Sequence, residues 1–265
     1  MKRRNFLSAV TAGVLALGLG SAALADSTIS QIKSQGRIKV GLGTFVPWAF
    51  PNRDGQLIGF EVDVATRLAQ DLGVKLELVP TAWDAIIPSL IAGKYDVIIG
   101  GLTITEERAK TVDFTLPYEH SQVFALVNRK VAPQITTLAQ LDDPAVTFAA
   151  RRGSSASPAR FFPKAQVLFF DDENTQQQEF VNGNVTAIST ATPTPALLLE
   201  EHPDLVKILE PAVEQTDEAF AIRKQDPDTL AAFNEWIKAR TDDGWLQARF
   251  DYWFKGRSWK DQAAG

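Results

Sequence analysis

An alternation of strand-like and helix-like segments between Arg37 and Gly101 constrains the fold of this chain more than any other feature. The expected elements, in order, are a strand at 37–42, a helix at 59–73, a strand at 74–78, a helix at 84–92 and a strand at 97–99. The first helix carries Val64, Leu68 and Leu72 on one face and stops at a glycine. This β-α-β-α-β order predicts an α/β lobe with a mainly parallel sheet.

A second α/β pattern follows in the middle of the chain. Strands are expected at 146–150, 167–170 and 185–189, with a helix at 175–181. The last third adds an apolar strand at 219–222 and two helices with apolar faces. The sequence therefore predicts two α/β units, with boundaries near 127–130 and 215–218.

The N-terminus has the three parts of a secretory signal peptide. A basic start at 2–4 precedes an apolar run at 9–24, which is too short and too rich in Gly and Ala to favour a membrane span. Small residues suit cleavage after Ala25, so residues 1–25 are expected to be removed and the mature chain to begin at Asp26. The adjacent arginines also suit a twin-arginine export signal, although ordinary signals contain such pairs. We therefore expect a periplasmic protein.

Composition limits the partners and cofactors. The 265 residues include no cysteine, which excludes a disulfide framework, a thiolate metal site and a lipidated N-terminal Cys. The net charge of -5 argues against nucleic acid as a partner, because phosphate binding needs a basic surface. We expect a soluble, unanchored monomer without a cofactor or metal.

Short motifs along the chain carry a family resemblance. They are Phe-Val-Pro-Trp at 45–48, Gly-Phe-Glu-Val-Asp-Val-Ala at 59–65, Gly-Lys-Tyr-Asp at 93–96, Gly-Leu-Thr-Ile-Thr-Glu-Glu-Arg at 101–108, Asp-Phe-Thr at 113–115 and Pro-Tyr at 117–118. In this order and spacing, the chain from Ile38 to Phe254 resembles the bacterial extracellular solute-binding proteins of family 3, whose members mostly bind amino acids.

The resemblance implies a periplasmic-binding-protein (Venus flytrap) fold, in which two α/β lobes are joined by a two-strand hinge. Lobe 1 would be discontinuous, with a first part at 26–127 and a return at 218–265 that includes the C-terminal helices. Lobe 2 would be 128–217. The implied function is to bind a small carboxylate-bearing ligand in the interlobe cleft and to deliver it to the membrane permease of an ABC importer.

The segment 101–108 suits an anion without reference to any family. The strand at 97–99 runs into two glycines and a helix is expected to begin near Thr105, so free backbone N–H groups face the cleft. Arg108 can grip a carboxylate with two hydrogen bonds and Thr103 can add a hydroxyl. A solvated Arg108 and a simple capping role for Thr105 are the alternative. The resemblance implies that the matching positions clamp the ligand carboxylate, with Gly101 contributing its carbonyl.

The resemblance also implies walls for the ligand. Phe45 and Trp83 match positions that sandwich the ligand in relatives, although either could be plain core. Trp48 and Phe50 are expected in the core. In lobe 2, the matching residues are Arg151, which can reach the ligand in relatives, and Ser154 and Ser155, which can offer a backbone N–H. The alternatives are a surface role for Arg152 and a solvated, Ser-rich turn.

One position departs from the family pattern. Ala191 stands where amino-acid binders generally carry the Asp that pairs with the ligand's ammonium, and a buried ammonium without a partner is costly. The sequence therefore predicts a positively charged cleft and an anionic ligand, such as a dicarboxylate, a keto or hydroxy acid, or an aromatic carboxylate. The alternative is an amino acid whose ammonium is held by another acid, with the candidates Glu119, Asp172, Asp217 and Glu218.

Two other classes of function are weaker. Cyclohexadienyl dehydratases share the implied fold, and one of their loops carries an Asp and a catalytic Glu. The matching loop of this chain is Ala-Thr-Pro-Thr at 191–194, so the general acid is missing at Thr194. His120 and His202 are isolated and no nucleophile motif or metal cluster appears, so we do not expect an enzyme. A sensory receptor domain would need a membrane span and an effector after Lys260, and a free-standing signalling binder would need a separate receptor.

Overall fold

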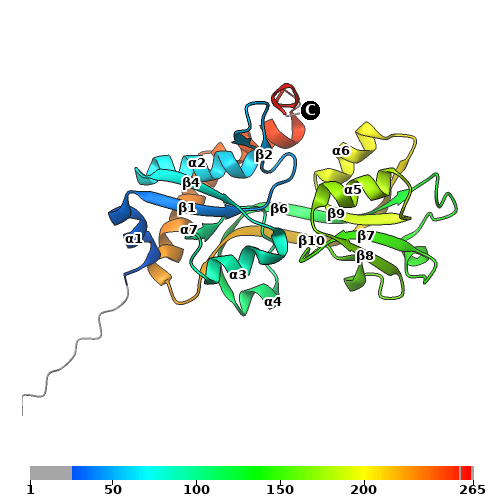
Figure 1. The fold of residues 1–265 in the computed structure, drawn as a ribbon, viewed down its shortest axis with the longest axis horizontal. Coiled ribbons are helices and arrows are strands. Elements are labelled where there is room, and N and C mark those ends of the chain that lie inside the picture. Colours follow the sequence, from blue (N-terminus) through cyan, green and yellow to red (C-terminus); the bar gives the residue numbers. More distant parts are fainter. Residues whose placement is uncertain (1–25, 257, 264–265) are drawn as a thin grey trace, which may run out of the picture.

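The computed structural model describes residues 26–256 and 258–263 and has two α/β lobes joined by two long strands (Figure 1). The expected signal peptide, residues 1–25, lies outside this part of the chain. Within it, none of the helices has the length and apolar character needed to cross a membrane.

Strands from both lobes form one eight-stranded mixed sheet, in the order β4-β1-β5-β10-β6-β9-β7-β8. The strands are β1 (Arg37–Leu42), β2 (Phe50–Pro51), β3 (Leu57–Ile58), β4 (Lys75–Pro80), β5 (Val97–Ile98), β6 (Val112–Asn128), β7 (Thr147–Arg151), β8 (Gln166–Phe170), β9 (Ala187–Ala191) and β10 (Val206–Arg223). The helices are α1 (Thr28–Gln35), α2 (Phe60–Leu72), α3 (Ile86–Ile91), α4 (Glu106–Ala109), α5 (Glu173–Val181), α6 (Thr194–Glu201), α7 (Pro227–Asp242) and α8 (Trp245–Phe250).

In lobe 1, β1 pairs in parallel with β4 and β5. The apolar face of α2 is fully buried at Phe60, Val64 and Leu68. This helix ends at Gly73, which adopts the left-handed conformation (φ 69°). Its N–H donates to the Ala69 and Gln70 carbonyls and so closes the last turn. The predicted helix at 59–73 is therefore confirmed with nearly the same ends.

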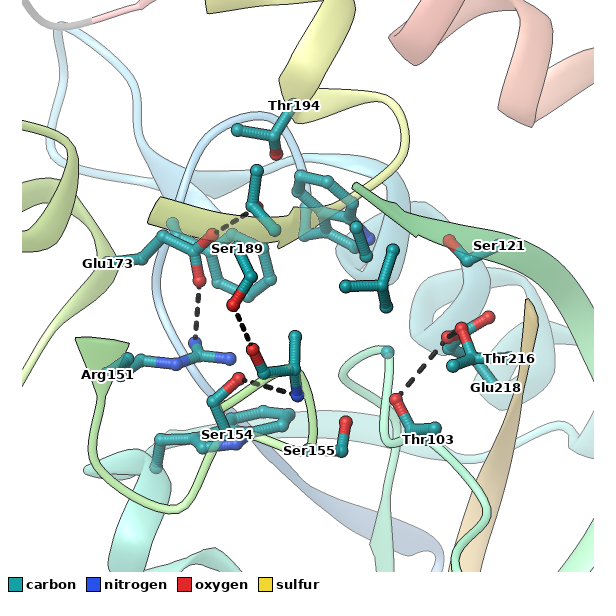
Figure 2. Close-up of a pocket in the computed structure, with 18 of the residues that line it drawn as sticks. Thr103, Ser121, Arg151, Ser154, Ser155, Glu173, Ser189, Thr194, Thr216 and Glu218 are labelled. Atoms are coloured by element: carbon teal, nitrogen blue, oxygen red, sulfur yellow. Dashed lines mark hydrogen bonds and ion pairs between the residues drawn. The ribbon is translucent and has the colours of Figure 1, made fainter. Parts of the chain in front are cut away.

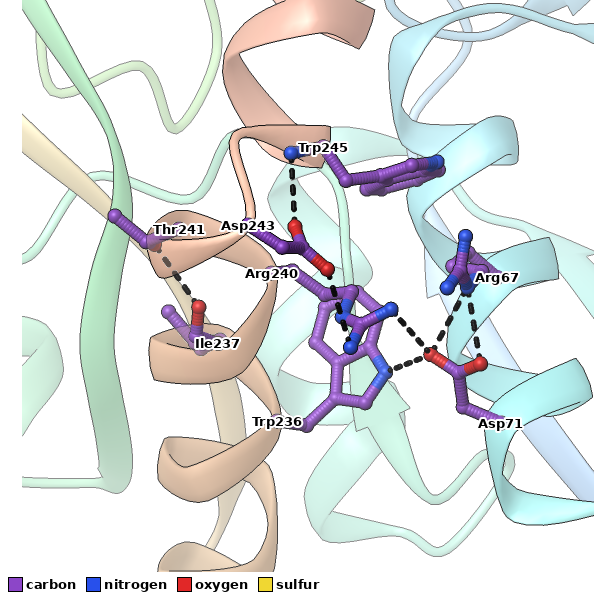
Figure 3. A network of polar contacts seen from close by, with 8 residues as sticks. All are labelled: Arg67, Asp71, Trp236, Ile237, Arg240, Thr241, Asp243 and Trp245. Carbon is purple, nitrogen blue, oxygen red and sulfur yellow. Dashed lines mark hydrogen bonds and ion pairs between the residues drawn. The ribbon is translucent and has the colours of Figure 1, made fainter.

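The returning chain docks on α2 through a polar network (Figure 3). Asp71 accepts hydrogen bonds from Arg67 Nε at 2.9 Å and from the Trp236 indole N–H at 2.8 Å. Arg240 lies 3.6 Å from Asp71 and 3.2 Å from Asp243. Because Trp236 and Arg240 belong to α7, this network fixes the C-terminal part of the chain against the first part of lobe 1.

In lobe 2, β7 pairs in parallel with β8 and β9. Apolar side chains pack on both sides of these strands, with Phe148 in one cluster and Phe180 in the other. Helix α5 begins two residues before the predicted 175 because Asp172 accepts a hydrogen bond from the Thr175 N–H and so caps its first turn.

The two hinge strands, β6 with 17 residues and β10 with 18, run through both lobes and pair antiparallel. The predicted parallel pairing is found among β1, β4 and β5, and the antiparallel hinge strands make the complete sheet mixed. β6 already pairs with β9 of lobe 2 from Val123, five residues before the predicted boundary at 128. Across the hinge, the register places Glu119 opposite Glu218 and His120 opposite Asp217.

Candidate functional site

A cavity lies between the lobes, next to the hinge strands (Figure 2). Lobe 1 and the hinge line it with Phe45, Trp48, Trp83, Gly101, Thr103, Glu119, Ser121, Val123, Thr216 and Glu218. Lobe 2 lines it with Arg151, Ser154, Ser155, Ala156, Glu173, Gln176, Ser189, Thr190, Ala191 and Thr194. Every site residue that the sequence predicted, except Arg108, therefore lines one cavity.

The loop after β5 forms part of the lobe 1 wall and is held by the hinge. Its Ile104 N–H donates to the Asp217 carbonyl at 2.8 Å, and its Leu102 carbonyl accepts from the Ala219 N–H at 3.2 Å. Gly101 adopts a positive φ of 64°, which glycine tolerates best, and its N–H donates to the Tyr118 hydroxyl. These bonds fix the backbone of Gly101 and Thr103 at the cavity.

Two carboxyl side chains of the hinge line this cavity, from Glu119 of β6 and from Glu218, its paired residue on β10. Glu119 is 4% exposed and Glu218 is 5% exposed. Neither oxygen of Glu119, nor Oε2 of Glu218, has a hydrogen-bond partner within the described residues. Oε1 of Glu218 accepts from the hydroxyls of Thr216 at 2.8 Å and Thr103 at 3.4 Å.

The environment of these carboxyls disfavours their charge. Burial raises the pKa of Glu119 well above its ordinary value, and the neighbouring Glu218 and Glu61 raise it further. The Trp48 indole N–H lowers it by a smaller amount, because it lies near the carboxyl without reaching full hydrogen-bond geometry. Burial raises the pKa of Glu218 to about 7, although the Thr216 and Thr103 hydroxyls lower it. Burial has this effect because it removes the carboxylate charge from water. An added cation would find three carboxyl oxygens here that still lack a partner.

Lobe 2 contributes the guanidinium of Arg151. Its central carbon lies 4.3 Å from the ring centroid of Trp83 and 5.1 Å from that of Phe45. On the other side, Arg151 Nη1 lies 3.6 Å from Glu173 Oε2, while the Thr190 hydroxyl donates to Glu173 Oε1 at 3.2 Å. Because Phe45 and Trp83 belong to lobe 1, the Arg151 contacts join the two lobes.

The remaining lobe 2 residues lie on the turn after β7 and at the end of β9. The Ser154 N–H donates to the Arg151 carbonyl, and Ser154 Oγ accepts from the Ala156 N–H at 3.2 Å. The Ser189 hydroxyl donates to the Ala156 carbonyl, which ties this turn to β9. Ala191 ends β9 and presents only a methyl group to the cavity.

Arg108 takes a different position from the one expected. It belongs to α4, whose first turn is capped by the Thr105 hydroxyl, as predicted. Its guanidinium donates to the Thr103 carbonyl at 2.8 Å and to the Gly153 carbonyl of lobe 2 at 2.9 Å. Arg108 therefore bridges the lobes beside the cavity, next to a second and more open pocket that Ser154, Ser155 and Arg160 share.

The charge of the cavity also differs from expectation. Its lining contains one arginine, Arg151, and three carboxyl groups, on Glu119, Glu173 and Glu218. Arg152 lies outside it, paired with the exposed Asp171 at 2.9 Å. The described lining therefore lacks the excess of positive side chains that the sequence predicted, because the hinge adds two carboxyl groups to it.

Sequence reasoning missed some of the lining. Trp48 was expected only in the core, but it both packs on Phe45 and lines the cavity. Asp172, a candidate acid, is the cap of α5, and the next residue, Glu173, is the one at the cavity. The position of Glu173 in the first helical turn after a strand was the available signal.

The two histidines do not contribute to this site. His120 Nδ1 lies 2.6 Å from Asp217 Oδ1, with both side chains largely exposed on the hinge. His202 ends α6 and does not line the cavity.

Comparison with known proteins agrees with this architecture. The model for bacterial extracellular solute-binding proteins, family 3, matches residues 38–256. The L-cystine-binding protein TcyJ of Escherichia coli (strain K12) is 33% identical over 253 residues, which are 95% of each chain. Cyclohexadienyl dehydratase of Pseudomonas aeruginosa is 27% identical over 235 residues, 88% of each chain.

A solved structure extends the likeness to three dimensions. The crystal structure of an ancestral amino-acid-binding protein, a precursor of cyclohexadienyl dehydratase, matches with a TM-score of 0.80 and 36% identity, covering 86% of this chain and 100% of that chain. The family model and the 33% identical relative each span most of the chain. This chain therefore belongs to family 3 of the bacterial extracellular solute-binding proteins, the binding components of amino-acid-type ABC importers.

Proposed function

We propose that the protein captures an α-amino acid in the interlobe cavity, as a periplasmic monomer, and delivers it to the membrane permease of its importer. In this proposal the hinge carboxylates Glu119 and Glu218 hold the ligand's ammonium. The ligand carboxylate lies on the opposite side of the cavity, where the Trp83 indole and the backbone of Ser155 supply N–H donors.

The unpaired buried atoms carry this proposal. Six side-chain polar atoms of the described residues are buried without a hydrogen-bond partner, and five of them belong to residues that line the cavity. The five are the acceptors Glu119 Oε1, Glu119 Oε2 and Glu218 Oε2, and the donors Trp83 Nε1 and Arg151 Nε. Buried polar groups are normally paired, so a cavity with free acceptors and free donors suits a zwitterion.

An anionic ligand remains the second candidate because Ala191 lacks the family's amine-binding acid. A keto acid or dicarboxylate would use Arg151 and Trp83, but it would leave the oxygens of Glu119 and Glu218 unpaired or protonated. The unpaired acids favour the amino acid. The relatives also support an amino acid as the ligand, since one is an L-cystine-binding protein and another is an ancestral amino-acid-binding protein.

The dehydratase relative raises an enzymatic alternative, but the cavity holds no group in the position of a catalytic acid after β9. Thr194 lines the cavity where those enzymes are expected to carry Glu. We therefore propose binding without catalysis. Incubation of the protein with a cyclohexadienyl substrate, followed by mass spectrometry of the dehydrated product, checks this, and turnover would contradict it.

The experiment that tests the ligand class uses matched pairs. Protein purified under native conditions is denatured, and the released small molecules are identified by mass spectrometry. Refolded protein is then titrated calorimetrically with each amino acid and its deaminated keto acid. The proposal expects an amino acid in the extract and a strong preference for it over the keto acid. A preference for the keto acid would instead support the anionic candidate.

A further inference from the structure

The aromatic pair Phe45 and Trp83 is already occupied in the closed cleft, by a cation of the protein itself. The guanidinium of Arg151 lies against both rings, and Arg151 is only 9% exposed. Glu173 lies 3.6 Å from Arg151 Nη1 and supplies the counter-charge. Two aromatic rings and a buried carboxylate are the surroundings that would also bind the cationic side chain of a ligand.

We infer that Arg151 is a specificity-determining residue, which fills the Phe45–Trp83 pair from within the protein and so restricts the cleft to amino acids without a cationic side chain. This inference rests on the proposed function, because it concerns the side chain of the amino acid whose ammonium the hinge carboxylates hold. It assigns arginine and lysine to the rejected ligands, and neutral or acidic amino acids to the accepted ones.

Closure is the step at which rejection acts. Arg151 belongs to β7 of lobe 2, whereas both rings belong to lobe 1, so Arg151 reaches the rings only when the lobes meet. A ligand guanidinium or ammonium on the rings would occupy the volume that Arg151 needs. It would also place a second positive charge beside Arg151, whose carboxylate Glu173 is already paired with Arg151 and with the Thr190 hydroxyl.

The same geometry favours a polar or acidic side chain. Arg151 Nε and Trp83 Nε1 are buried donors without a partner among the described residues. A carboxylate, amide or carbonyl of the ligand side chain could accept from Arg151 Nε, while a cationic group has no acceptor to offer it. Arg151 thus acts as both a steric and an electrostatic selector.

Removing Arg151 should reverse the preference. Arg151→Ala vacates the space against Phe45 and Trp83 and leaves Glu173 as a buried carboxylate without its counter-charge. That is a site for a guanidinium or an alkylammonium. Arginine or lysine should then bind, with the side chain supplying the charge that Arg151 supplied before.

The test compares L-arginine and L-lysine with L-glutamine, L-glutamate and L-cystine, by calorimetry on unfolded and refolded, ligand-free protein. Wild type should bind at least one of the three non-cationic probes about tenfold or more tightly than either cationic probe. Arg151→Ala should shift the ratio by about tenfold or more towards arginine or lysine. The double variant Arg151→Ala/Glu173→Gln should lose that gain, because the free carboxylate is gone.

The control is Arg152→Ala, which removes the adjacent arginine, exposed and paired with Asp171 outside the cavity. It should leave the ligand ratios unchanged. Wild type that binds arginine or lysine as tightly as every other probe would overturn the inference even if Arg151→Ala does not fold. A folded Arg151→Ala variant with the same ratio of cationic to non-cationic ligand affinities as wild type would also overturn the inference. Wild type that binds no amino acid from a full panel would overturn the proposed function and this inference with it.

Discussion

Replacing Glu218 by glutamine should stabilise the empty protein at alkaline pH while weakening ligand binding. Glu218 is 5% exposed, one of its oxygens is unpaired, and its pKa is raised from the ordinary 4.5 to about 7, mainly by burial. Between these two values the unfolded chain loses the proton but the folded protein keeps it. The folded state is therefore favoured at low pH and loses that advantage as pH rises through 7.

The size of the effect follows from the shift. A rise from 4.5 to about 7 corresponds to about 3 kcal/mol at roughly 1.4 kcal/mol per pH unit, of which about 2 to 3 kcal/mol develops between pH 5 and pH 8. Glutamine cannot ionise, yet its carbonyl can still accept from the Thr216 and Thr103 hydroxyls. Any fixed loss from an unpaired amide N–H is the same at both pH values, so the difference between them isolates the charge.

The assay is urea denaturation of ligand-free wild type and Glu218→Gln at pH 5 and pH 8. The variant should gain about 2 to 3 kcal/mol relative to wild type over this interval. Glu235→Gln, which removes an exposed carboxyl on α7, is the matched control and should change little. Equal pH dependence in wild type and Glu218→Gln would refute the conclusion that burial in the cavity raises the pKa of Glu218.

Four further results are expected. Glu119→Gln should weaken amino-acid binding by about ten- to a hundredfold, because a charge-assisted hydrogen bond to the ammonium is lost, while calorimetry should show no loss for the matching keto acid. Amino-acid affinity should rise between pH 6 and pH 8, since Glu218, with a pKa of about 7, must lose its proton before it can pair with an ammonium; flat affinity over this range would argue against that pairing. Arg108→Ala should lower ligand affinity by about ten- to a hundredfold, because it removes the hydrogen bond to the Gly153 carbonyl that joins the closed lobes. Unchanged affinity in a folded variant would exclude both this lobe-joining role and a carboxylate clamp. Mass spectrometry of the exported protein should give a chain that begins at Asp26, whereas an intact N-terminus in the membrane fraction would contradict cleavage.

Elements with local causes could be predicted from the sequence. Helix α2 follows from apolar spacing and a glycine stop, and the cap at Thr105 from its place before Glu106 and Glu107. The hinge strands could not be predicted at full length. Their polar residues near the crossing break the apolar alternation, and they form strands because β6 and β10 pair with each other over both lobes. Long-range pairing overrides local preference here.

The site divides in the same way. The positions of Phe45, Trp83 and Thr103 at the cavity could be predicted, because each matches a family motif in the sequence. The approach of Glu119 to Glu218 was hidden, because it depends on the register between strands almost a hundred residues apart in sequence. The lobe-bridging contact of Arg108 was hidden for a related reason. Its guanidinium reaches the Gly153 carbonyl, which arrives from the other lobe only when the cleft closes.

If the hinge carboxylates hold the ligand's ammonium, as we propose, their position determines which half of the protein recognises the ligand first. An Asp at position 191 would place the amine's partner on lobe 2, so that the ammonium and lobe 1 would meet only through closure. Here Glu119 and Glu218 lie on the hinge strands, and Glu218 is bonded to Thr103 of the lobe 1 loop. Lobe 1 and the hinge can therefore hold the ammonium while the cleft is open. In the proposed order of binding, closure then adds Arg151 from lobe 2, which contacts the ligand's side chain after the amine is already bound.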